Sequence, residues 1–141
     1  MHEPRAIAKA YAIEAEADFQ VAHILSGTEY HSRTVFMAQQ AAEKMVKACL
    51  ALRGIYTTDH NLSSLFRAVY GGELPEAEEL LRAVDALERH GARVRFPLFH
   101  RSDLPIWIPS HSYRIEDAQR ALTMATGVVT ALRAHLEKAL G

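Results

Sequence analysis

The chain has 141 residues, of which 49% are hydrophobic and 23% are charged. These fractions fit one globular domain over residues 1–141 and exclude long disordered stretches, because enough apolar side chains exist to build a core. The net charge of −1 excludes a protein whose whole surface attracts nucleic acid, so an anion site must come from local clustering. Cys49 is the only cysteine, which excludes an internal disulfide. Without a signal-peptide pattern or a membrane-spanning apolar run, we expect a cytoplasmic protein.

Five segments repeat apolar residues at intervals of three and four positions, the pattern of amphipathic helices. They span about residues 5–26, 30–53, 61–70, 75–90 and 115–140. Glycine follows each of the first four, as it commonly does where a helix ends. Asn61 or Asp59 is placed to cap the short third helix, because both side chains accept hydrogen bonds from free amide groups. We therefore predict an all-α fold, an up-and-down antiparallel bundle of four long helices and one short helix.

A proline-containing segment, residues 92–114, separates the last two predicted helices, and connections of this length are commonly functional. Basic residues gather in it and just before it: Arg89, His90, Arg93, Arg95, His100 and Arg101. Such a cluster creates a local positive field that binds phosphate groups even when the whole chain is nearly neutral. The alternative is that these arginines pair with the glutamates at positions 76, 78, 79 and 88, or only keep the segment soluble.

His100 and Arg95 are the candidate catalytic residues of this segment. Metal-free cleavage of a phosphodiester needs a base that takes the proton of an attacking hydroxyl and donors that stabilise the charged phosphorus centre. Histidine titrates near neutral pH, so His100 is the candidate acid or base and Arg95 the candidate donor. One histidine per chain serves both roles only if a homodimer brings two of them together. Arg93 and Arg101 would add contacts to RNA or to a nucleotide.

The second predicted helix carries polar residues beside its apolar stripe, which is unusual for a helix in a bundle. Gln40, Glu43, Lys44 and Lys47 share one face at spacings of three and four. Glu43 and Lys47 also have the spacing of a helical ion pair. Two interpretations stay open: this face binds RNA or a nucleotide, or it is a buried hydrogen-bond network in which Glu43 holds Arg95 or a helix end.

Several motifs occur in order from this helix onward. Phe36-x-x-Gln39-Gln40-Ala41-x-Glu43-Lys44-x-x-Lys47-Ala48 comes first. Gly54 and an H-x-L-x-x-L stretch that begins at His60 follow it, then Arg95-Phe96-Pro97, and finally P-x-x-x-Y from Pro109 with Glu116-Asp117-Ala118. The ordered set resembles the HEPN family (higher eukaryotes and prokaryotes nucleotide-binding) and covers residues 30–122, most of the chain.

The resemblance implies a helical bundle that forms homodimers and is encoded beside a minimal nucleotidyltransferase as a toxin–antitoxin pair. Some members are metal-independent ribonucleases with an R-x4-6-H motif near the start of the last long helix. Arg95 and His100 fit that spacing, but they fall in the 92–114 segment instead. Arg114 also stands where the family usually has a serine or threonine. A catalytically silent nucleotide-binding or partner-docking module therefore stays open, as does a purely structural dimerisation domain.

The remaining candidate residues have simpler interpretations. His60 is expected to be a turn or cap residue rather than a catalyst. Tyr113 is expected to pack in the bundle, and Cys49 to lie in the core. The apolar triplet at 106–108 is expected to cover the chain's own core or a dimer interface rather than stack on a base. No histidine spacing typical of a metal site occurs, so we expect neither a metal nor a cofactor.

Overall fold

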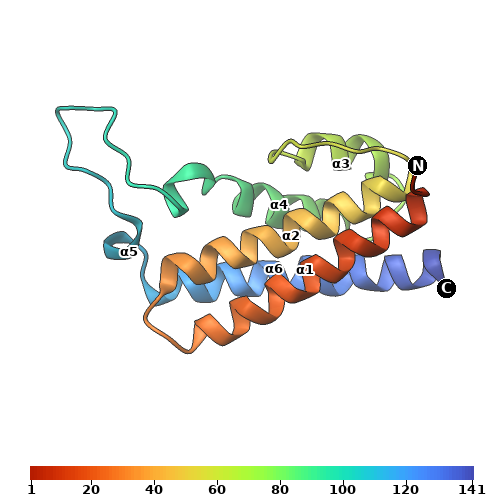
Figure 1. Ribbon diagram of the computed structural model, residues 1–141, viewed down its shortest axis with the longest axis horizontal. Helices are drawn as coiled ribbons and strands as arrows, with labels where there is room; N and C mark the ends of the chain where they lie inside the picture. The colour runs from red at the N-terminus through yellow and green to blue at the C-terminus, as the bar shows by residue number, and fades with distance from the viewer.

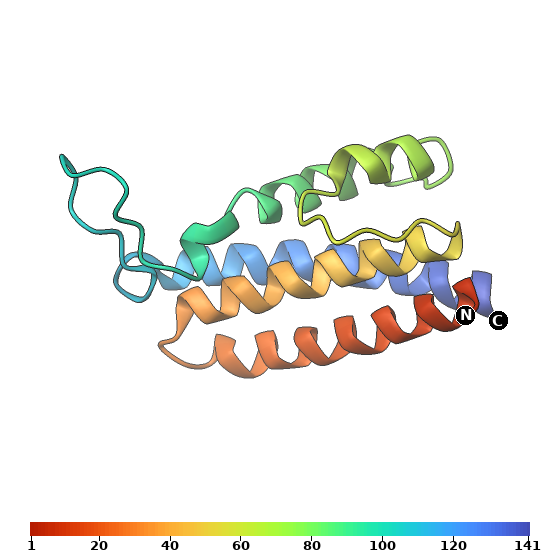
Figure 2. The same cartoon turned by 45° about the horizontal axis from the view of Figure 1, so that its top comes forward.

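The helices of the computed structural model, which describes residues 1–141, confirm the predicted all-α fold. The long helices are α1 (Pro4–Ser26), α2 (His31–Leu52), α4 (Ala77–Glu88) and α6 (Ile115–Leu140), and the short one is α3 (Ser63–Tyr70). Two single turns were not predicted, the 3-10 turn η1 (Gly91–Val94) and α5 (Pro109–Ser112). The long helices run alongside one another, and both chain ends lie at the same end of the bundle (Figures 1 and 2). None of the helices has the length and apolarity needed to cross a bilayer.

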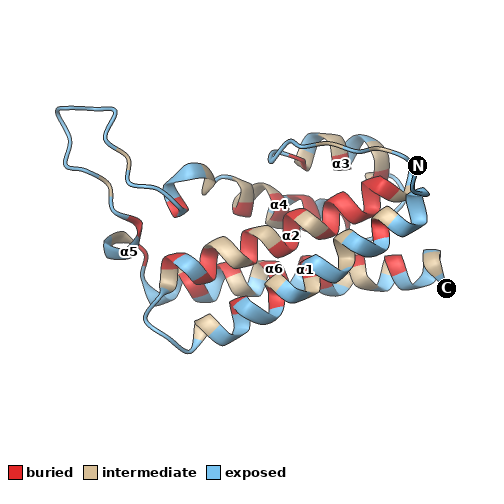
Figure 3. Ribbon diagram, viewed as in Figure 1, coloured by how far each residue is buried: buried red, intermediate tan, exposed pale blue.

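Helix α2 forms the centre of the bundle. Of its 22 residues, 15 are buried, whereas α1 buries only four. It packs against α1, α4 and α6, so the buried surface continues around most of it (Figure 3). Small side chains such as Ala38, Ala41 and Ala48 are completely buried and let the neighbouring backbones come close. Cys49 is also fully buried, as predicted.

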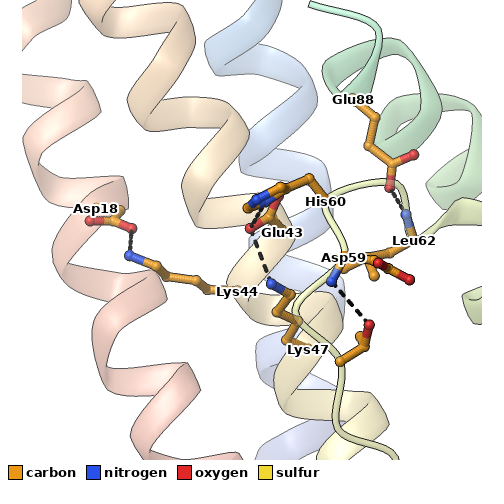
Figure 4. A network of polar contacts seen from close by, with 9 residues as sticks. Asp18, Glu43, Lys44, Lys47, Asp59, His60, Leu62 and Glu88 are labelled. Carbon is orange, nitrogen blue, oxygen red and sulfur yellow. Dashed lines mark hydrogen bonds and ion pairs between the residues drawn. The ribbon is translucent and has the colours of Figure 1, made fainter. Parts of the chain in front are cut away.

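The start of α3 differs from the prediction. The helix begins at Ser63, and neither Asn61 nor Asp59 caps it. The Leu62 amide instead donates a 2.5 Å hydrogen bond to the carboxylate of Glu88, at the end of α4 (Figure 4). Burial raises the pKa of Glu88, while its hydrogen bonds from Leu62 and Ser63 act in the opposite direction. The cap is therefore supplied by a tertiary contact that joins α3 to α4.

Residues 95–108 leave the bundle as a projecting loop, which we call the arm. It lies at the end of the molecule opposite the two termini (Figures 1 and 2). Leu98 and Trp107 form an antiparallel bridge between its two legs, with both N–H···O distances at 3.0 Å. The candidate residues Arg95, His100 and Arg101 all lie on this arm.

Candidate functional site

A cluster of four side chains holds the base of the arm against the bundle. The Trp107 indole N–H donates a 2.6 Å hydrogen bond to the Arg93 carbonyl, and the Arg93 guanidinium lies 4.8 Å from the centroid of the indole. Trp107 also meets Tyr113 edge-on at 6.1 Å, and the Tyr113 hydroxyl lies 2.7 Å from Nδ1 of His90. Tyr113 is buried in the core, as predicted. Of the apolar triplet, only Trp107 packs on the core, since Ile106 and Ile108 are exposed.

His90 and Tyr113 are both held in their uncharged forms. Burial lowers the pKa of His90, the positive charge of Arg93 lowers it further, and Asp117 acts in the opposite direction. Burial raises the pKa of Tyr113. The hydrogen bond at the base of the arm therefore joins two neutral groups at neutral pH.

This burial predicts a pH dependence of stability that His90 controls. In the unfolded chain a histidine titrates near pH ~6.5, whereas His90 in the fold has a lowered pKa, so the unfolded state takes up the proton first. The His90 contribution is complete above pH ~6.5 and is lost as the pH falls toward the lowered folded-state pKa. We expect His90→Gln, which does not titrate, to lose less stability than wild type over this window.

Urea unfolding of both proteins between about pH 8 and pH 5 measures this difference. Burial also lowers the pKa of His135, but that residue is present in both proteins and cancels in the comparison. Parallel stability curves for the two proteins would contradict the assignment to His90.

Three of the four basic candidates on or beside the arm come together around a hollow of about 240 Å³. Its lining consists of Arg93, Leu98, His100, Arg101, Leu104, Pro105 and Trp107. Arg101 is bound to Asp103 through two hydrogen bonds, at 2.6 and 3.1 Å. The alternative pairing with glutamates does not occur: neither Arg93 nor Arg101 forms an ion pair with one, and Arg89 pairs with Asp85.

Arg95 points to a different part of the molecule from His100. Its guanidinium lies 5.5 Å from the centroid of Phe36 on α2 and 5.2 Å from that of Phe96. It does not line the hollow that contains His100. The ring of His100 is exposed and has no hydrogen bond to another group of the chain. One chain alone therefore does not bring Arg95 and His100 into one site.

The polar side chains of the α2 face form two separate groups of contacts, one around Glu43 and one at Lys44 (Figure 4). Lys47 lies 3.4 Å from the Glu43 carboxylate, as the helical spacing predicted, and Nδ1 of His60 lies 3.1 Å from it. Lys44 instead pairs with Asp18 of α1 at 2.5 Å. The Glu43 and Lys47 side chains are only 6% and 10% exposed, so this part of the face is a buried ionic network.

Glu43 does not hold Arg95, so that part of the sequence interpretation is wrong. His60 lies at a bend of the linker before α3, which fits the turn that was expected, but it reaches Glu43 and does not cap the helix. No local pattern signals a contact between residues 17 positions apart. Gln39 is buried with its carbonyl oxygen unpaired, and Gln40 is half-buried. No three His, Cys, Asp or Glu side chains gather in a way that would hold a metal ion.

The fold and this site define an up-and-down helical bundle that presents basic residues on an arm at one end. The sequence model of the HEPN domain family matches residues 8–135. A relative called "Putative toxin MJ1304", from Methanocaldococcus jannaschii, is 33% identical over 140 residues, which cover 95% of this chain and 91% of that protein. The chain belongs to the HEPN domain family.

Two solved structures share this fold. ST0689, described as an archaeal HEPN homologue, aligns with a TM-score of 0.69 at 20% identity, over 96% of this chain and 99% of that one. TT1696 from Thermus thermophilus aligns with a TM-score of 0.72 at 24% identity, over 90% of this chain and 96% of that one. At these identities the likeness shows the fold alone.

Proposed function

We propose that this protein is the HEPN component of a toxin–antitoxin module, with a minimal nucleotidyltransferase as its partner. In this proposal it acts as a homodimer that binds RNA or a nucleotide through its arm. The observation that carries the proposal is the grouping of Arg93, His100 and Arg101 around one hollow. Two exposed guanidinium groups on a chain of nearly zero net charge favour anion binding at this place. The relative named as a toxin supports the module.

The proposed reaction is RNA cleavage without a metal. A neutral histidine takes the proton of the 2′-hydroxyl, whose oxygen attacks the adjacent phosphorus, and the 5′-oxygen leaves with a proton from a second, protonated histidine. The products end in a 2′,3′-cyclic phosphate and a 5′-hydroxyl. His100 is the proposed acid or base, and Arg95 stabilises the charge that develops on phosphorus. Because Arg95 and His100 are separated within one chain, the second copy completes the site.

The α2 face adjoins this site through Arg95. Arg95 lies over Phe36, and Gln40 is one helical turn farther along α2. In the proposal, Gln40 contacts the bound RNA or nucleotide directly. Glu43, Lys44 and Lys47 are committed to contacts within the chain, so they contribute by fixing the shape and charge of this face.

A second candidate function is a catalytically silent module that binds a nucleotide or docks the partner protein. The separation of Arg95 from His100 and the lack of any group orienting the His100 ring favour it. Histidines that act as general bases are normally oriented by a hydrogen bond to their second nitrogen. Binding without cleavage would distinguish this candidate from the first.

The test is RNA cleavage by the purified protein in EDTA, with His100→Ala in parallel. We expect wild type to produce 2′,3′-cyclic phosphate ends and His100→Ala to be slower by a factor of about 10²–10⁴, the usual contribution of a general acid or base. His111→Ala is the matched control, because His111 is an exposed histidine on α5 that does not line the hollow. Intact RNA in every sample at high protein concentration would refute catalysis and leave the binding module.

A further inference from the structure

The lining of the hollow in the arm combines apolar side chains with basic ones. Leu98 and Trp107 pair across the two legs, and side chains alternate between the faces of an extended chain. Accordingly, Leu98, His100, Pro105 and Trp107 line the hollow, whereas the intervening Phe99 and Ile106 do not. Phe99 and Ile106 are 74% and 60% exposed.

The size and chemistry of the hollow restrict what it accepts. Its volume of about 240 Å³ is below that of most small-molecule pockets, roughly 300–1,000 Å³. A single nucleotide has a flat base with weakly polar faces and a charged phosphate, which match the apolar and the basic side chains of this lining. A base that is paired and stacked inside a duplex cannot enter a hollow of this kind without leaving its stack.

We propose that the arm hollow seats one unpaired nucleotide of an RNA strand, with its base against Leu98, Leu104 and Pro105 and its phosphate on Arg93 and Arg101. This inference rests on the proposed binding of RNA and names the unit that is bound. Trp107 also lines the hollow, and Arg93 already covers one face of its indole. The guanidinium of Arg93 therefore meets the phosphate from a fixed position.

Asp103 acts against this binding. It accepts hydrogen bonds from Nε and Nη2 of Arg101, so fewer Arg101 donors remain for a phosphate. The same contact lowers the pKa of Asp103, so the carboxylate is charged at neutral pH and repels an incoming anion. Removing this charge with Asp103→Asn should therefore strengthen nucleotide binding, although the residue lies on the protein surface.

The test is fluorescence anisotropy with a labelled single-stranded 2′-O-methyl RNA hexamer, which cannot be cleaved because its 2′-oxygens are blocked. We expect Arg101→Ala to weaken binding about tenfold and Asp103→Asn to strengthen it several-fold, as expected for charge-assisted phosphate contacts. Leu104→Ala should weaken binding about threefold through lost apolar contact with the base. Trp107 is the only tryptophan, so its intrinsic fluorescence should change as the hexamer binds to wild type.

Matched controls separate the hollow from the rest of the arm. Ile106→Ala removes an alkyl side chain of similar exposure outside the hollow, and Arg67→Ala removes an ion-paired arginine on α3 whose exposure is close to that of Arg101. Both should bind the hexamer as wild type does, and the duplex form of the hexamer should bind at least tenfold more weakly. Equal effects of Leu104→Ala and Ile106→Ala, weaker binding by Asp103→Asn, or equal affinity for the duplex would overturn the proposal.

The failures of the two proposals can be told apart. Wild type could bind the hexamer while the variants in the hollow bind it with unchanged affinity and the Trp107 fluorescence stays constant. In that case RNA binding stands, and the proposed nucleotide position in the hollow is wrong. If wild type binds no hexamer by anisotropy, both the proposed RNA binding and the nucleotide seat are wrong.

Discussion

Replacing Glu43 with alanine is expected to lower the free energy of unfolding by about 3 kcal/mol or more, because it leaves the Lys47 ammonium buried without its partner. The Lys47 side chain is only 10% exposed, and Glu43 is the one carboxylate that pairs with it. His60 would lose its partner as well, but it is 63% exposed and is solvated at little cost. Equilibrium unfolding of the full-length chain in urea measures this change in the free energy of unfolding.

The double variant Glu43→Met, Lys47→Met is the control for this prediction. Replacing both members of a buried ion pair with apolar side chains of similar length is often neutral or stabilising. We therefore expect the double variant to be far more stable than Glu43→Ala, with a free energy of unfolding near that of wild type. If Glu43→Ala costs less than about 1 kcal/mol, Lys47 reaches water easily and the network is not a buried one.

Replacing Tyr70 with alanine is expected to cost about 3–5 kcal/mol, the usual range for deleting a buried aromatic ring. Tyr70 is completely buried at the end of α3 and stacks on Phe66. Its ring also meets His135 of α6 edge-on, and the Arg53 guanidinium lies 4.6 Å from its centroid. Its hydroxyl donates a 2.6 Å hydrogen bond to the Cys49 carbonyl, so one side chain connects α3 to α2 and α6.

Two further variants separate the contribution of the Tyr70 hydroxyl from that of its buried ring. Tyr70→Phe should cost only about 1 kcal/mol, because it removes the hydrogen bond and keeps the ring. Burial raises the pKa of Tyr70 to about 12, so the hydroxyl stays a neutral donor at every pH used for the measurement. Tyr56→Ala is the exposed control and should leave stability within about 0.5 kcal/mol of wild type. Similar losses for Tyr56→Ala and Tyr70→Ala would show that burial of the ring is not the cause.

Helix boundaries were predicted best where the signal lies within one turn of the chain. The last long helix spans Ile115–Leu140, as its apolar repeat indicated. Asp117 accepts a 2.8 Å hydrogen bond from the Arg114 amide, so this helix start is satisfied without a serine or threonine at 114. The start of α3 was predicted incorrectly because its cap, Glu88, lies 26 positions away in the sequence.

In the candidate site, too, the sequence predicted contacts between near neighbours but not contacts between distant residues. The basic cluster and the Glu43–Lys47 pair follow from spacing, since residues four apart on a helix are neighbours. The R-x4-H spacing does not show where its two members point. In the structure, Leu98 and Trp107 pair across the two legs of the arm, and His100 lines the hollow beside them. Arg95 instead lies over Phe36 of α2.

The sequence by itself therefore determined the family, the all-α bundle and the concentration of basic residues in one connection. Each of these depends on periodicity, motif order or local charge, which the chain carries in neighbouring positions. The tertiary structure alone decided that Glu43 meets His60 and that Arg93 rather than Arg95 shares the hollow with His100. Such contacts join residues whose distance is set by how helices and loops pack in three dimensions, and no local pattern encodes that distance.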